Sequence, residues 1–384
     1  MTTEQRLRRL LSLLLPVAGW RLPVAFLHGP DRAAGRQVSL LTAGAPGITG
    51  YVASRFFAEE PQSEYLGLVS AWRLERFLNQ QAPRADLTVA GMDRHSARLW
   101  MGRSFLRCPA WVGSGMPVPA DTAAVMKSST QLWRDLNYIR ADPFESTPST
   151  DSADLDLFYE RYYQPFILSR HGALAHIRSR WDMRRRFRRG CILWLSRGGI
   201  RVAGSLVSRL GDTLELVALG VLDGDANHRR RGTMTALYLH EIEHARRTGC
   251  KRLFLGGSRP SLHDDVFRTK RRWGAAAGLH PEVNFDMLVR WNTLTGPVAD
   301  FLTRNSLIYH DSGGLSALWH APDGTPDAAH LKKEVMRLWT PGLRRLDVLR
   351  SPAATAACPP LPDVRWITLE SLAQTSPEGL RLQG

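Results

Sequence analysis

Residues 214–237 combine chemical groups that could hold a phosphorylated ligand. An apolar run is followed by a polar connection, the basic run Arg229-Arg230-Arg231, Gly232 and the start of a helical pattern. The first amides of a helix have no partners within the helix, and together with the helix dipole they attract anions. Glycine lets a phosphate approach the backbone, and arginine binds one through paired hydrogen bonds. We therefore predict a pyrophosphate site on the amides of residues 230–234, with an ordinary solvated basic face as the alternative.

Glu215 is the second residue of chemical interest, because it interrupts the apolar run of residues 213–221. Alternation along a strand would put Glu215 on the same face as Val217 and Leu219. A charged strand residue commonly pairs with an opposite charge on the neighbouring strand, and Arg201 and Arg209 are the candidate partners. The residue pattern alone therefore favours a structural ion pair.

A meander and a crossover are predicted to position these residues. Three apolar runs separated by glycine turns, at 191–196, 200–210 and 213–221, indicate an antiparallel meander. Residues 232–248 form an amphipathic helix followed by Gly249, and residues 251–256 form a further short apolar run. A strand, a helix and a strand at this spacing form a crossover, so the strands at 213–221 and 251–256 should be parallel neighbours. The predicted fold class is mixed α/β.

The chain is long enough for more than one domain, and its composition changes at residues 141–151. This stretch reads ADPFESTPSTD and is predicted to be a linker, because it is rich in proline, serine and threonine. We predict domains at residues 1–145 and 152–295 and a C-terminal extension at residues 296–384. A strand is predicted at residues 285–291, within the second domain.

The run Arg229-Arg230-Arg231-Gly232-Thr233-Met234 resembles the R-x-x-G-x-G/A signature of the GNAT acyltransferases. Residues 266–274, VFRTKRRWG, resemble the second signature of that family, a helix that ends in an aromatic residue and a glycine. The layout also resembles the FemAB-type proteins, which carry two GNAT-like domains in tandem. The resemblance covers about residues 155–291, and it extends to the N-terminal half by size and position only.

The resemblance implies a GNAT-like fold, with a degenerate copy of that domain as the expectation for the N-terminal half. It implies an acyl-CoA donor, with Glu215 as the general base that takes a proton from the acceptor amine. This sequence departs from the family's pattern at two positions. Met234 stands where the family usually has Gly or Ala, and Arg268 stands where the family often has a tyrosine that acts as an acid. The residues implied in donor binding are Leu219 and Val221 for the pantetheine arm, and Arg229, Arg230, Arg231, Gly232, Thr233 and Met234 for the phosphates.

The activity expected from the resemblance is direct transfer of an acyl group, with acetyl as the first expectation, from acyl-CoA to an amine. No metal is expected, and no cysteine or serine stands beside an obvious base as a covalent nucleophile. One alternative is a FemAB-like aminoacyl or peptidyl transferase that uses aminoacyl-tRNA, and another is a GNAT-type binding module without activity. The net charge of +15 attracts a phosphorylated cofactor, a nucleic acid or an acidic membrane alike.

Cysteine usage indicates a cytoplasmic protein with reduced thiols. The four cysteines, Cys108, Cys191, Cys250 and Cys358, have neither metal-ligand nor disulfide-framework spacing. A basic segment precedes an apolar run at residues 10–18, which is too short to span a bilayer. A soluble amphipathic helix is the prediction for this run, with a membrane-surface helix and a signal segment as alternatives.

Overall fold

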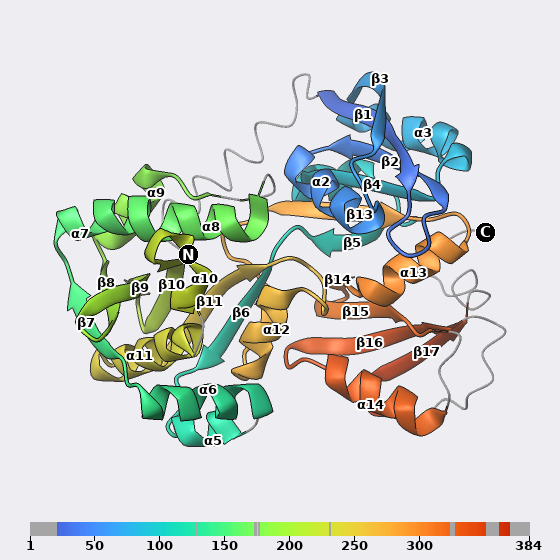
Figure 1. Ribbon diagram of the computed structural model, residues 1–384. Coiled ribbons are helices and arrows are strands. Elements are labelled where there is room, and N and C mark those ends of the chain that lie inside the picture. Colours follow the sequence, from blue (N-terminus) through green and yellow to red (C-terminus); the bar gives the residue numbers. More distant parts are fainter. Residues whose placement is uncertain are drawn as a thin grey trace. The chain divides into compact units, whose positions relative to one another are not determined.

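The computed structural model describes residues 21–127, 129–172, 175, 177–229, 232–322, 327–350 and 361–368 (Figure 1). The predicted helix at residues 10–18 lies outside these ranges. The chain divides into two compact units. Unit 1 comprises Met1–Val112, Arg259–Asp265 and Gly278–Gly384, and unit 2 comprises Gly113–Ser258 and Val266–Ala277. The predicted boundaries at 145, 152 and 295 therefore differ from the observed division, in which the chain passes between the units more than once.

A seven-stranded mixed sheet forms the centre of unit 2, with the strand order β12-β6-β11-β10-β9-β8-β7. The antiparallel pairs β8–β9 and β9–β10 form the predicted meander, and β10 is parallel to β11 as predicted. The strands are β6 (Val112–Pro117), β7 (Glu145–Ser149), β8 (Gly190–Arg197), β9 (Ile200–Leu210), β10 (Thr213–Val221), β11 (Arg252–Ser258) and β12 (Ala276–Leu279).

The stretch predicted as a linker contains strand β7, which pairs antiparallel with β8. Pro148 is accommodated because β7 is an edge strand, so one side of its backbone needs no hydrogen-bond partner from another strand. The composition of this stretch is typical of a loop, but pairing with the buried strand β8 determines its conformation.

Helices cover both faces of the unit 2 sheet (Figure 1). On one face, Phe158 and Met183 pack against Val217 of β10. On the other face, Tyr238 packs against Leu216 of β10. The first face carries α7 (Ser152–Leu157), the π-helical turn η2 (Phe158–Tyr163), α8 (Gln164–His171) and α9 (Arg180–Phe187), and the second carries α5 (Thr122–Lys127), α6 (Thr130–Ala141), α11 (Thr233–Arg247) and α12 (Asp265–Arg272). The turn η4 (Leu222–Gly224) and α10 (Ala226–Arg229) connect β10 to α11.

Helix α11 forms where the sequence predicts it. Its apolar side chains Ala236, Leu237 and Ile242 are almost fully buried against the sheet. The helix is followed by Gly249, whose φ of +69° is the left-handed conformation that glycine adopts most readily after a helix. The meander, the parallel pair and the intervening helix that the sequence predicts are therefore all present in unit 2.

Unit 1 contains two further sheets. The first has the order β3-β1-β2-β4-β13-β5 and is antiparallel except for the pair β2–β4, and the second has the order β14-β15-β16-β17. The strands are β1 (Arg21–Pro30), β2 (Gln37–Gly44), β3 (Gln62–Ser70), β4 (Leu87–Asp93), β5 (Leu106–Pro109), β13 (Phe285–Arg290), β14 (Leu307–Asp311), β15 (Gly314–His320), β16 (Leu343–Arg350) and β17 (Val364–Thr368). The helices are α2 (Pro46–Phe56), α3 (Ala71–Gln81), η1 (Ala82–Arg84), α4 (Arg94–Trp100), α13 (Gly296–Arg304) and α14 (Ala328–Leu338).

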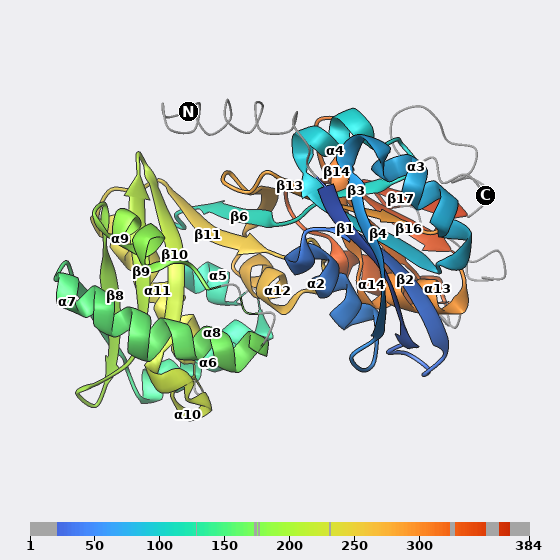
Figure 2. The ribbon, with the colours of Figure 1, turned by 90° about the horizontal axis from the view of Figure 1, so that it is seen from above.

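Each unit completes its main sheet with a strand from a distant part of the sequence. Strand β6 lies beside β11 in unit 2, although it precedes β11 by more than one hundred residues (Figure 2). Strand β13 was predicted in the second domain, but it lies between β4 and β5 in the sheet of unit 1. Of the helices in the described ranges, none combines the length and the apolar character needed to cross a membrane.

Candidate functional site

Strands β10 and β11 separate after a short parallel pairing. The pairing joins Thr213–Glu215 to Arg252–Phe254, and within the described chain no later residue of β10 pairs with β11. A β-bulge shifts the register of β10 between Leu216 and Ala218, and Gly256 of β11 adopts a φ of +76°. Both features bend a strand away from its neighbour. At their carboxyl ends, the two strands therefore have facing edges to which no strand of the described residues is bound.

The bulge also changes which side chains share a face of β10. Val217 and Ala218 both pack into the cluster formed with α7, η2 and α9. Leu219 packs beside Leu237 of α11 in another cluster. Glu215, which pairs with Arg186 of α9, shares the predicted face with Val217, but Leu219 does not, because the bulge interrupts the alternation after Leu216.

Glu215 is held in an ion pair. Its Oε2 lies 2.6 Å from Nη1 of Arg186, whose side chain is only 2% exposed. The predicted partners are different: Arg201 pairs with Asp154, and Arg209 donates to backbone carbonyls. The carboxylate lies on β10 just before the bulge, and it compensates a buried guanidinium.

The start of α11 is covered on one side by α6. Gly232 has a φ of +84°, and a Cβ atom there would lie 3.0 Å from the carbonyl oxygen of Asp135 and 3.1 Å from Cγ1 of Ile139. Thr233 is completely buried. The hydroxyl of Thr235 donates to Oδ2 of Asp135 at 2.6 Å. The protein thus places its own carboxylate beside the first turn of α11, where a bound phosphate was predicted.

The remaining predicted phosphate ligands are not assembled into one exposed group. Arg229 is exposed at the end of α10, whereas Met234 is half-buried against the apolar cluster around Leu237. Arg230 and Arg231 lie outside the described residues. Arg229 is therefore the predicted ligand that the described structure leaves open to a phosphate.

Leu219 and Val221 lie at the carboxyl end of β10, where the donor arm was predicted. They pair with Ser205 and Ala203 of β9 on one edge of the strand. Between them, a Cβ atom on Gly220 would come within 2.6 Å of the backbone of η2, so only glycine allows this close packing. Their other edge faces the divergence from β11.

A buried lysine lies beside the divergence, and the sequence reasoning missed it. Lys270 of α12 is 4% exposed, and its Nζ donates to the carbonyl oxygen of Gly257 at 2.7 Å. A Cβ atom on Gly256 would lie 3.9 Å from this Nζ. Lys270 is one of several basic residues in α12, and its spacing of three from the buried Phe267 is the signal that places it on the buried side of the helix.

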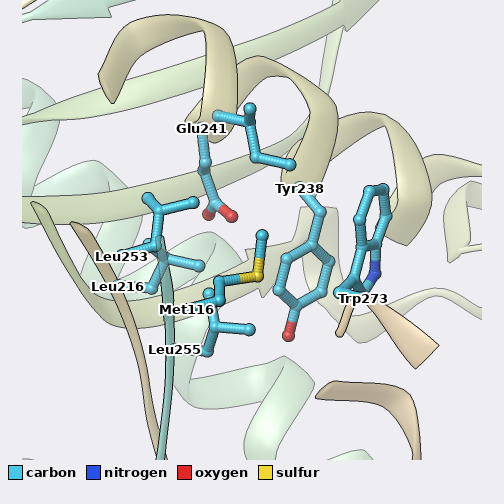
Figure 3. A pocket seen from close by; sticks show the side chains of 8 residues that line it. Met116, Leu216, Tyr238, Glu241, Leu253, Leu255 and Trp273 are labelled. Carbon is cyan, nitrogen blue, oxygen red and sulfur yellow. The ribbon is translucent and has the colours of Figure 1, made fainter. Parts of the chain in front are cut away.

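A small pocket lies between α11 and the sheet of unit 2 (Figure 3). It is too narrow to hold a water molecule. Leu216 and Leu255, the first residues beyond the parallel pairing, belong to its wall. Tyr238 stacks on Trp273 at a ring-centroid distance of 5.3 Å. The pocket therefore adjoins the divergence of β10 and β11 on the α11 face.

The carboxyl group of Glu241 points into this pocket (Figure 3). Glu241 is 1% exposed, and neither carboxyl oxygen has a hydrogen-bond partner among the described residues; the same holds for the nearby hydroxyl of Ser205. Burial raises the pKa of the Glu241 carboxyl to about 8, and Ser205 lowers it in part. The group is therefore mainly protonated at neutral pH.

Comparisons with known proteins find solved structures of low similarity to this chain. No protein-family model and no curated protein sequence matches it. L-PGS from Bacillus licheniformis aligns at 10% identity over 71% of this chain and 85% of that chain, with a TM-score of 0.35. FemX aligns at 10% identity over 71% and 88%, also with 0.35. A GCN5-related N-acetyltransferase from Sphaerobacter thermophilus aligns at 13% identity over 70% and 76%, with 0.32. These values are too low to assign a function.

Proposed function

We propose that unit 2 transfers an acyl group from an activated donor to an amine, at the divergence of β10 and β11. The observation that supports this most directly is the parallel pairing that stops after Glu215 while both strands continue. Free strand edges bind extended chains through backbone hydrogen bonds. An extended donor arm would bind along residues 219–221 and bring its acyl carbon to the point where the strands separate.

Two side chains near this point supply the proposed chemistry. Negative charge develops on the carbonyl oxygen when an amine attacks an acyl group, and a buried cation stabilises it. Lys270 is the proposed source of that charge, because its ammonium lies at the carboxyl end of β11. Glu215 is the proposed base for the amine. Its ion pair with Arg186 means that substitution also affects the fold, so activity and stability must be measured together.

The donor remains a choice between acyl-CoA and aminoacyl-tRNA. Arg229 and Gly232 belong to the signature that implies acyl-CoA, with acetyl-CoA as the first candidate. The packing of α6 against Gly232, with the carboxylate of Asp135 beside it, disfavours a pyrophosphate on that side of α11. This contact favours aminoacyl-tRNA as the second candidate.

The test is a transfer assay with both donor classes. The full chain is incubated with labelled acetyl-CoA and longer acyl-CoAs, or with a mixture of labelled aminoacyl-tRNAs, and with a panel of amino acids and amino sugars. The proposal expects labelled amide with one donor class. Lys270→Met should lower kcat about 100-fold or more. Lys127→Met is the matched control, because Lys127 is exposed on α5.

Two results would contradict the proposal. The first is the absence of transfer with every donor, which would favour a binding module without activity. The second is full turnover by a Lys270→Met variant whose melting temperature is unchanged. Retention of the chain on immobilised CoA, competed away by free CoA, would identify the donor as acyl-CoA rather than aminoacyl-tRNA.

A further inference from the structure

One end of the unit 2 sheet carries a cluster of exposed cations. They lie in three loops or at the ends of the elements that these loops join: the loop before β8, the turn between β9 and β10, and the connection from α11 to β11. We call this group the basic end surface. Its members, all exposed, are Arg188, Arg189, Arg209, Arg246, Arg247, Lys251 and Arg252.

Backbone and side-chain contacts hold the three loops together. The amide of Arg209 donates to the carbonyl oxygen of Arg189 at 2.9 Å, which joins the first loop to the second. Nη1 of Arg209 donates to the carbonyl oxygen of Thr248 at 2.7 Å, and the amide of Lys251 donates to the carbonyl oxygen of Asp212 at 2.7 Å. These two bonds join the second loop to the third. The seven cations therefore lie on one connected surface of a rigid sheet end.

The basic end surface is not neutralised by the protein. Within the described ranges, none of its seven cations lies within 4.0 Å of a carboxylate oxygen in an ion pair. The three loops contain a single carboxylate, that of Asp212. By contrast, Arg180 and Arg184 of the neighbouring helix α9 both pair with Asp156. Uncompensated cations on a fixed scaffold attract a polyanion, and this attraction weakens with salt.

The chemistry of the surface favours RNA over a membrane. Six of the seven cations are arginines, which bind phosphate oxygens with paired hydrogen bonds and stack on bases. At the end of β9, beside these loops, the large apolar side chain of Leu210 has 48% exposure. A protein surface that enters a membrane interface usually presents an apolar or aromatic face as well. We propose that the basic end surface binds the phosphate backbone of structured RNA.

This surface lies at the opposite end of α11 from the predicted phosphate site. The 15-residue helix places it about 22 Å from Gly232. RNA binding is measurable without turnover, so it does not depend on the proposed function. If aminoacyl-tRNA is the donor, a contact at this distance would hold the body of the RNA while its acylated end reaches the divergence of β10 and β11.

The experiment measures binding of the full chain to a fluorescent RNA hairpin by anisotropy, between about 50 and 200 mM salt. The test variant carries Arg188→Gln, Arg189→Gln and Arg247→Gln. The matched control carries Arg73→Gln, Arg76→Gln and Arg98→Gln, three exposed arginines of unit 1 that remove the same charge. Each phosphate contact contributes about tenfold in affinity near 0.1 M salt. The test variant should therefore lose at least tenfold in affinity and bind with a shallower salt dependence, and the control should lose less than threefold.

Three results would overturn the inference: no RNA binding by the unmodified chain at low salt, equal losses in the two triple variants, or a test variant that binds the hairpin normally. Vesicles of phosphatidylglycerol and phosphatidylcholine are measured in parallel. Binding to these vesicles that depends on the basic end surface, without binding to the hairpin, would assign the surface to a lipid headgroup and also refute RNA as its ligand.

Discussion

Replacing Glu241 with glutamine removes an ionisable group from the small pocket under α11 and keeps nearly the same shape. The carboxyl is 1% exposed and has no hydrogen-bond partner among the described residues. Burial in such surroundings disfavours the charged form. The side chains that face it from the other elements are apolar, apart from Tyr238 of α11 and Ser205 of β9. No neighbouring charge in the described structure thus compensates an ionised Glu241.

The expected consequence is a stability that falls as the pH rises. Glutamate ordinarily has a pKa of 4.5, and burial raises the pKa of Glu241 to about 8. Between these values the unfolded chain has lost the proton while the folded chain still holds it, so raising the pH favours unfolding. Each pH unit in this window costs about 1.4 kcal/mol, which gives a total of roughly 5 kcal/mol at pH 8 and above.

The assay is urea-induced unfolding at pH 5, 7 and 9. We compare the free energy of unfolding of Glu241→Gln with that of the unmodified chain. This difference should shift in favour of the variant by roughly 3 kcal/mol as the pH rises from 5 to 7, and by about 1 kcal/mol more between pH 7 and 9. Glu243→Gln is the control, because Glu243 lies on the same helix with 56% exposure. A difference between Glu241→Gln and the unmodified chain that stays constant across this pH range would refute the reasoning.

Two further substitutions test contacts around the candidate site. Gly232→Ala should lower the free energy of unfolding by about 1 to 3 kcal/mol, because the residue has a φ of +84° and a Cβ atom would press on Asp135. An unchanged melting temperature would show that α6 does not pack there. Glu215→Gln should lower the free energy of unfolding by about 2 kcal/mol, because Arg186 loses a charged partner in the interior. Urea unfolding measures this change, and an unchanged stability would contradict a structural ion pair.

Local patterns were sufficient to predict most elements of unit 2. The apolar spacing from Met234 to Ala245 and the glycine after it fix the helix that became α11. Glycine turns separate β8, β9 and β10, and the strand–helix–strand order predicts that β10 and β11 are parallel. These features depend on residues close together in the sequence, so one sequence is enough to find them.

The features that were missed depend on residues far apart in the sequence. Asp135 meets Thr235 across one hundred residues, and nothing near either residue indicates the contact. The bulge at Leu216–Ala218 follows from the pairing of β10 with β9, so simple alternation could not reveal it. Glu241 is the exception, because its spacing of three from Tyr238 places it on the buried face of α11. That spacing was a usable signal.

The exchange of strands between distant parts of the sequence affects how the chain folds during synthesis. Strands β4 and β5 leave the ribosome early, but β13, which lies between them, follows roughly 180 residues later. At typical translation rates this interval lasts on the order of ten to thirty seconds. Unpaired strand edges exposed for so long are prone to aggregation. The nascent N-terminal half is therefore a natural client for ribosome-associated chaperones until β13 is made.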